Sequence, residues 1–272
     1  MSGVPLAARP LPRTGRVTLP HVILSEWTKL RSVRSTRWAL LLAFLFAVGV
    51  AAIACAVVSH HWPQMHARDR ADFHPLEVNL AGVQLAQLAI GVLGVLVITA
   101  EYSTGMIRAS MSAVPRRLPV LWAKAIVYGA TTLALMVPAA LLAFVVGESI
   151  LSGRNIDIAF SHPGVARAVV GAGLFLTVVG LFGLGLGAIV RNTAGGIALF
   201  AGLMFVLPPL MNVLPTSWNN AASPYLPLQA GQTIMSITPG NHLSPWGGFA
   251  VLCGYAAAAL VVAALLLRRR DV

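Results

Sequence analysis

The segment ITAEYSTGMIRASMSAVPRRLP, residues 98–119, begins at the end of one apolar stretch and stops just before another. Each of these stretches is long enough to cross a bilayer as a helix. Between them lie a carboxylate, Glu101, a glycine, three arginines and two prolines. A plain positively charged loop between two spans accounts for the arginines but not for the rest.

A short helix is expected inside this segment, capped by Ser103 or Thr104 and ended by Pro115. Glu101 is favourable near the start of such a helix. A helix that docks into the groove of a partner presents apolar anchors at i, i+4 and i+7 with charged residues around them. The residues at that spacing are Ile107, Met111 and Val114.

The composition places the rest of the chain in a membrane. Mean hydropathy is +0.80, and 57% of the residues are hydrophobic against 10% charged, whereas soluble domains average about 25% charged residues. Because backbone groups in lipid must bond internally, continuous apolar runs of helix length predict membrane-spanning helices rather than strands. The predicted fold is an all-α integral membrane protein with six spans, at about 38–58, 79–99, 122–146, 165–190, 195–214 and 247–267.

The basic residues predict the orientation of these spans. With the N-terminus inside, all but four of the 19 Lys and Arg lie on the inner side, which follows the positive-inside rule. The four on the outer side are Arg68, Arg70, Arg154 and Arg167. The net charge of +11 therefore sets topology and attracts anionic lipids, and no nucleic-acid partner is expected. Both termini are predicted to be cytoplasmic.

The chain is predicted to divide into a disordered cytoplasmic tail, 1–20, and a single transmembrane domain, 21–272. The domain opens with a predicted amphipathic helix in the membrane interface. Its apolar stripe repeats at helical spacing, with Trp27 at headgroup depth. The stripe consists of Ile23, Trp27, Leu30 and Val33.

The sequence lacks the residues that several classes of protein need for their function. No Asp, Glu, Lys or His falls in the middle of a predicted span, so an ion-coupled carrier is disfavoured. No catalytic or phosphate-loop motif is present, so neither an enzyme nor a bound cofactor is expected. The four histidines between 59 and 78 fit no zinc spacing, so no metal site is predicted. A largely apolar pathway suits a hydrophobic or amphipathic cargo.

A few polar and small residues inside the spans are candidates for a pathway or for helix packing. Gln84 and Gln87 share one helix face, and Asn212 lies in the fifth span. Gly183 and Gly187 belong to a run of small residues that lets helices approach closely. The segment 215–246, without Lys, Arg, Asp or Glu, predicts outer re-entrant or interfacial helices before the last span.

Two motifs carry a resemblance. SEWTKLRSVRSTRW, residues 25–38, followed by ITAEYSTGMIRASMSAVPRRLPVLWAKA, residues 98–125, resembles the permease subunits of ABC type-2 exporters, especially those of actinobacteria. The first motif would then be the connecting helix, at Glu26, Trp27, Lys29, Leu30, Arg31 and Arg34. The second would be the coupling helix, which in that family touches the ATPase subunit, at Glu101, Tyr102, Thr104, Gly105, Met106, Arg108, Pro115, Arg116 and Arg117. Met106 departs from the family, where Thr is more usual.

The resemblance implies a partnership. A separate ATPase subunit would bind ATP and move the coupling helices, and a second copy of this permease or a sibling would complete the pathway. The expected location is the bacterial cytoplasmic membrane, and the expected activity is export. The alternative is a non-transporting scaffold or sensor subunit that docks the same ATPase.

Overall fold

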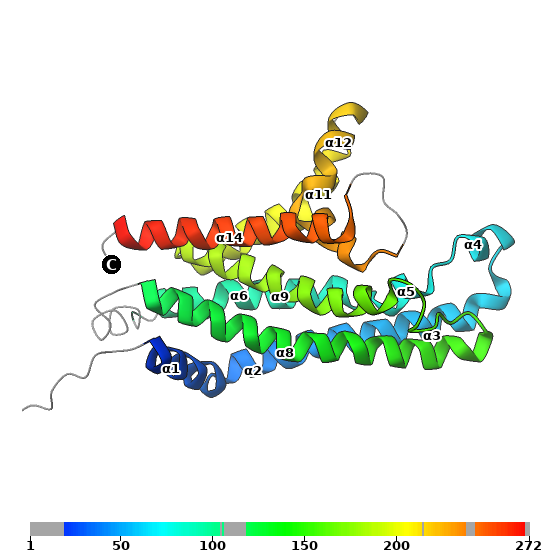
Figure 1. The fold of residues 1–272 in the computed structure, drawn as a ribbon, viewed down its shortest axis with the longest axis horizontal. Coiled ribbons are helices and arrows are strands. Elements are labelled where there is room, and N and C mark those ends of the chain that lie inside the picture. Colours follow the sequence, from blue (N-terminus) through cyan, green and yellow to red (C-terminus); the bar gives the residue numbers. More distant parts are fainter. Residues whose placement is uncertain (1–18, 104, 106–117, 214, 238–242, 270–272) are drawn as a thin grey trace, which may run out of the picture.

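The computed structural model describes residues 19–103, 105, 118–213, 215–237 and 243–269. Within these ranges the chain forms helices and turns, and no strand (Figure 1). The predicted all-α class is confirmed. The helices are α1 (Leu19–Ser32), α2 (Arg34–Leu45), α3 (Ala51–His61), α4 (Ala67–Ala71), α5 (Pro75–Asn79), α6 (Val83–Ser103), α8 (Leu118–Leu151), α9 (Val165–Val190), α10 (Thr193–Ala201), α11 (Leu207–Met211), α12 (Thr216–Ala222), α13 (Pro227–Gln232) and α14 (Pro245–Arg269).

In the described part of the chain, six helical segments are long and apolar enough to cross a membrane, and they lie over the six predicted stretches. The protein is therefore a multi-pass helical membrane protein. The six segments are Arg34–Gln64, Pro75–Ser103, Leu118–Arg154, Val165–Val190, Thr193–Met211 and Pro245–Arg269.

Two of these spans contain a π-helical segment. Phe46–Val50 joins α2 to α3, and Gly202–Val206 joins α10 to α11. The second precedes Pro208 and Pro209, which lack the N–H groups that would continue an α-helical ladder. By contrast, α8 continues through Pro138 as a single helix of 34 residues.

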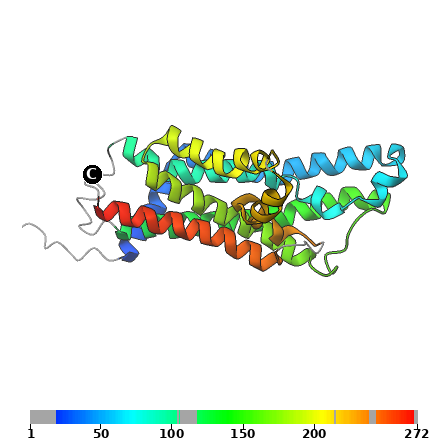
Figure 2. The same ribbon diagram turned by 90° about the horizontal axis from the view of Figure 1, so that it is seen from above.

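The bundle has two distinct ends (Figures 1 and 2). At the first, which we call the terminal end, α1 lies across the bundle, α6 and α14 finish and α8 begins. At the second, which we call the loop end, α3 and α8 finish and α4 and α5 connect the first span to the second. The connector 104–117, most of which lies outside the described residues, joins α6 to α8 at the terminal end.

Helix α9 occupies the centre of the bundle, where it packs against α6, α8 and α14 (Figure 1). Its contact with α6 is close because glycines face each other. A Cβ on Gly94 would collide with the carbonyl oxygen of Gly180, and a Cβ on Gly183 would collide with that of Gly91. Small residues at such positions bring transmembrane backbones together, which favours van der Waals packing.

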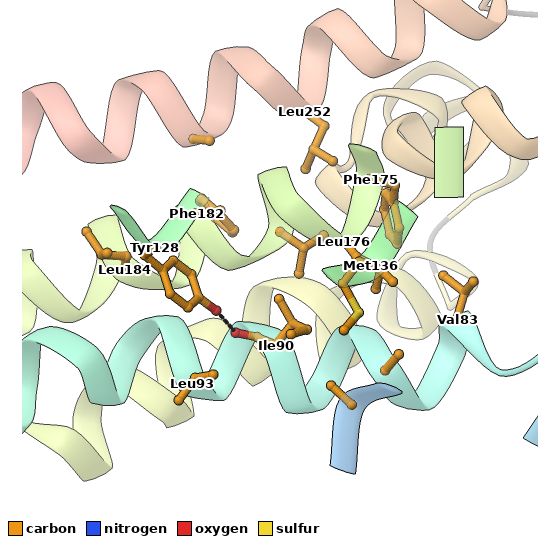
Figure 3. Close-up of a cluster of buried hydrophobic side chains, with 14 of the residues drawn as sticks. Val83, Ile90, Leu93, Tyr128, Met136, Phe175, Leu176, Phe182, Leu184 and Leu252 are labelled. Atoms are coloured by element: carbon orange, nitrogen blue, oxygen red, sulfur yellow. Dashed lines mark hydrogen bonds between the residues drawn. The ribbon is translucent and has the colours of Figure 1, made fainter. Parts of the chain in front are cut away.

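A buried tyrosine ties α8 to α6 beside this contact (Figure 3). Tyr128 is 1% exposed, and its hydroxyl donates a hydrogen bond of 2.6 Å to the carbonyl oxygen of Ile90. A Cβ on Gly180 would lie 2.9 Å from that hydroxyl, so the glycine leaves room for the bond. Phe175, Leu176 and Met136 extend the same core toward the loop end.

The segment before the last span forms two short helices, α12 and α13. α13 packs against α14 and α9. Arg167, at the start of α9, donates hydrogen bonds of 3.3 Å to the carbonyl oxygen of Ile234 and 2.9 Å to that of Ser236. These bonds hold the segment after α13 against the bundle.

Candidate functional site

Four charged side chains from three helices meet at the terminal end. Lys124, near the start of α8, lies 2.6 Å from Oε2 of Glu26 in α1 and 2.9 Å from Oε1 of Glu101 in the last turn of α6. Lys29 of α1 lies 2.7 Å from Oε1 of Glu26 and 3.2 Å from Oε1 of Glu101. We call these four residues the charged cluster. It joins α1 to both ends of the connector 104–117.

Three of the four residues are buried: Glu26 is 4%, Lys124 5% and Glu101 7% exposed. Two carboxylates and two ammonium groups give the cluster no net charge. Burying ions is costly, and here the cost is offset by short pairings on both carboxylates. Removing one partner from such a cluster leaves a buried charge uncompensated, which costs about 3–5 kcal/mol. The cluster therefore holds the three helices together as a unit.

The charges adjust each other's protonation. Burial by itself raises the pKa of Glu26, but Lys124 and Lys29 outweigh it and hold the pKa of this carboxyl below its ordinary value. Burial by itself lowers the pKa of Lys29, but Glu26 and Glu101 outweigh it and raise the pKa above its ordinary value. Both groups are therefore charged throughout the neutral range.

Helix α1 reaches the cluster through a face that the apolar stripe did not reveal. Val22 is four residues before Glu26 and packs against Val120 and Ala123 of α8. The predicted stripe lies to one side, and its Trp27 is 40% exposed. Of that stripe, Ile23 and Leu30 are partly buried against the core and Val33 is exposed, and Arg31 and Arg34 are exposed as well.

The predicted coupling residues divide into described and undescribed positions. Glu101 belongs to the charged cluster. Tyr102 lies beside it on α6, with the guanidinium of Arg191 at 5.4 Å from its ring centroid. Gly105 has φ of +70°, a left-handed conformation that favours glycine. Six further predicted positions lie outside the described residues: Thr104, Met106, Arg108, Pro115, Arg116 and Arg117.

The residues predicted to line a pathway or to pack helices lie at different positions in the bundle. Gln84 Oε1 accepts hydrogen bonds from Gln87 Nε2 at 2.8 Å and from Gln232 Nε2 at 3.2 Å, which links α6 to α13. Asn212 Oδ1 accepts one from Asn219 Nδ2 at 3.2 Å. Gly183 and Gly187 face α6. None of these five candidates lies in the charged cluster.

Sequence reasoning missed two features. It named Glu26, Lys29 and Glu101 but did not bring them together, and it counted Lys124 only as an inner-side charge. A lysine inside a predicted span needs a counter-ion, which is a signal for Glu26 or Glu101.

The second is a polar network at the loop end. Glu148 Oε1 accepts from Asn79 Nδ2 at 2.5 Å, and its Oε2 accepts from the backbone N–H of Ile158 at 2.9 Å. Cys55 Sγ donates to Asn79 Oδ1 at 3.1 Å.

No three His, Cys, Asp or Glu side chains in the described part of the chain are grouped so as to hold a metal ion. No protein-family model matches the sequence, and no curated protein matches it. Fold and site together define a multi-pass helical membrane protein with a buried charged cluster at the end of the bundle where α8 begins and α14 finishes.

Proposed function

We propose that the chain is the membrane-spanning permease subunit of an ABC type-2 exporter. The observation that carries the proposal is the charged cluster, because it fixes α1 to both ends of the connector 104–117. The two motifs that resemble the connecting and coupling helices of that family meet in this cluster. The six spans agree with the layout of such subunits.

The cluster supplies a way to transmit movement from a partner. A force on the connector acts on the last turn of α6 and the start of α8, and the cluster couples both to α1. Three helices would then move as one body, which an apolar contact alone would not enforce. In this proposal the work comes from a separate ATPase subunit that binds ATP differently in the two states.

The remaining parts of the proposal follow from sequence. The terminal end is cytoplasmic, in a bacterial cytoplasmic membrane with anionic lipids. A second copy, or a sibling permease, completes a pathway for a hydrophobic or amphipathic cargo. The chain itself hydrolyses no ATP and carries no cofactor.

Co-purification tests the partnership. The full chain is co-expressed with each ABC ATPase subunit encoded in the same genome, and bound ATPase is quantified. One of them should copurify, and the variant Arg108→Glu/Arg116→Glu/Arg117→Glu should retain at least tenfold less. The matched control Arg268→Glu/Arg269→Glu changes basic residues at the terminal end outside the connector and should retain all of it. Equal recovery with both variants would refute docking on the connector.

Cysteine labelling can distinguish a transporting permease from a non-transporting scaffold without knowledge of the cargo. In a Cys55→Ser/Cys253→Ser background, Gln84→Cys is labelled with a membrane-impermeant maleimide in proteoliposomes that contain the ATPase. ATP should change the labelling rate at least threefold if the bundle switches states. A rate unaffected by ATP, with the ATPase still bound, would favour the non-transporting scaffold.

A further inference from the structure

A cavity of about 510 Å³ lies beside the charged cluster, between α1, α2, α6 and α8. Volumes of about 300–1,000 Å³ are typical of small-ligand sites. Its walls are apolar and come mainly from α6, with Leu93, Leu96 and Val97, and from α8, with Val127. The cavity is therefore suited to a hydrocarbon chain.

One side of the cavity is charged, since all four members of the charged cluster line it. Three of the four carboxylate oxygens in the cluster accept from a lysine. The fourth, Oε2 of Glu101, is buried and has no hydrogen-bond partner among the residues that the structure describes. An unpaired buried carboxylate oxygen is destabilising, and it calls for a hydrogen-bond donor.

The cavity opens at the bend between α1 and α2. Ser32, Val33 and Ser35 line it there and are exposed. The first span begins at Arg34, so this opening lies where a bilayer changes from headgroups to hydrocarbon. Phospholipids are the amphipathic molecules that occupy this depth at high concentration, which makes them the natural occupant.

We propose that this cavity binds a membrane phospholipid whose headgroup carries a primary ammonium, as in phosphatidylethanolamine. The ammonium donates a hydrogen bond to Oε2 of Glu101 after a small rotation of that side chain, and an acyl chain lies along Leu93, Leu96 and Val97. Lys29 and the hydroxyls of Ser32 and Ser35 line the mouth on the side where the phosphate would lie.

The headgroup follows from charge complementarity. The cluster carries no net charge, so a zwitterionic lipid adds none. Phosphatidylcholine has no N–H to donate, and phosphatidylglycerol brings an uncompensated negative charge close to Glu101. The inference rests on the membrane location and not on the proposed ATPase partner.

Native mass spectrometry of the full chain tests the proposal. The protein is purified in detergent with equal mole fractions of phosphatidylethanolamine, phosphatidylcholine and phosphatidylglycerol. Wild type should retain phosphatidylethanolamine at least fivefold over either competitor. Equal retention of the three lipids, or retention of a non-lipid amphipath alone, would overturn the proposal.

Two variants locate the binding site. Val97→Phe fills the cavity and should lower retained phosphatidylethanolamine at least fivefold, while Val92→Phe, on the same helix but outside the cavity lining, should not. Glu101→Gln should lower the ratio of retained phosphatidylethanolamine to retained phosphatidylcholine to about one. If Glu101→Gln fails to fold, Val97→Phe and Val92→Phe still test whether the lipid binds in the cavity. Equal retention of phosphatidylethanolamine by these two variants would show that the lipid binds elsewhere.

Discussion

The two ends of the bundle fix their helices by different chemistry. At the terminal end, the buried Lys124, the partly exposed Lys29 and two buried glutamates join α1, α6 and α8. At the loop end, Glu148 is held by the amide of Asn79 and the backbone N–H of Ile158, both neutral donors. Removing a charged partner leaves another charge buried, whereas removing a neutral donor leaves Glu148 with its second bond. The terminal end should therefore resist separation more strongly than the loop end.

The largest expected effect comes from Lys124→Met at the terminal end. It leaves Glu26 and Glu101 without the cation that lies closest to both, so the free energy of unfolding should fall by about 3–5 kcal/mol. Lys29→Met is the matched control. Its side chain is 32% exposed, and it should cost less than about 1 kcal/mol. Denaturant titration of the purified proteins measures both, and equal losses would contradict a cluster centred on Lys124.

A substitution at the loop end should cost less. A Cβ on Gly147 would collide with Oδ1 of Asn79, so Gly147→Ala should displace the amide and destabilise the protein by about 1–3 kcal/mol. Gly153→Ala has open space around its Cβ and serves as the control, with a change below about 0.5 kcal/mol. A loss with Gly147→Ala larger than that with Lys124→Met would reverse the ranking of the two ends.

Asn79→Ala removes the amide itself and should cost about 1–2 kcal/mol, because Glu148 keeps the backbone N–H of Ile158. The exchange of amide hydrogens in α5 should accelerate, while exchange in α1 should stay the same. Faster exchange in α1 would show that the two ends are not independent.

The smallest effect is expected from pH, because it appears only at the extremes. The lowered pKa of Glu26 contributes stability that is full above its ordinary value of 4.5 and is lost as pH falls through the folded-state pKa. The raised pKa of Lys29 contributes stability that is full below 10.5 and is lost as pH rises through the folded-state pKa. The difference in unfolding free energy between wild type and Glu26→Gln should be constant from pH 5 to 10 and shrink at lower pH. A difference that grew on acidification would contradict the pairing of Glu26 with the lysines.

The sequence predicted the spans well because a bilayer imposes one simple requirement, a continuous apolar helix. Val165–Val190 coincides with its predicted range, and the ends of the other spans differ from prediction by between two and eight residues. The charged cluster was not predicted because it depends on tertiary contacts. Glu101 and Lys124 are 23 residues apart and Glu26 and Lys124 are 98 apart, and helical periodicity says nothing about such pairs. For α1, the apolar stripe did not reveal the face at Val22 and Glu26 that packs on α8.

Helix α8 is long enough to connect the terminal end of the bundle to the loop end. At about 1.5 Å per residue, its 34 residues form a rod of about 51 Å, which exceeds the roughly 30 Å of bilayer hydrocarbon. Lys124 is the seventh residue of α8, so the charged cluster binds this helix about 9 Å from its first residue. Pro138 lies inside the rod, and because proline has no backbone N–H it cannot make the helical hydrogen bond at that position. α8 is therefore held near its first residues by the charged cluster and has a position beyond its middle where the helix can bend within the membrane.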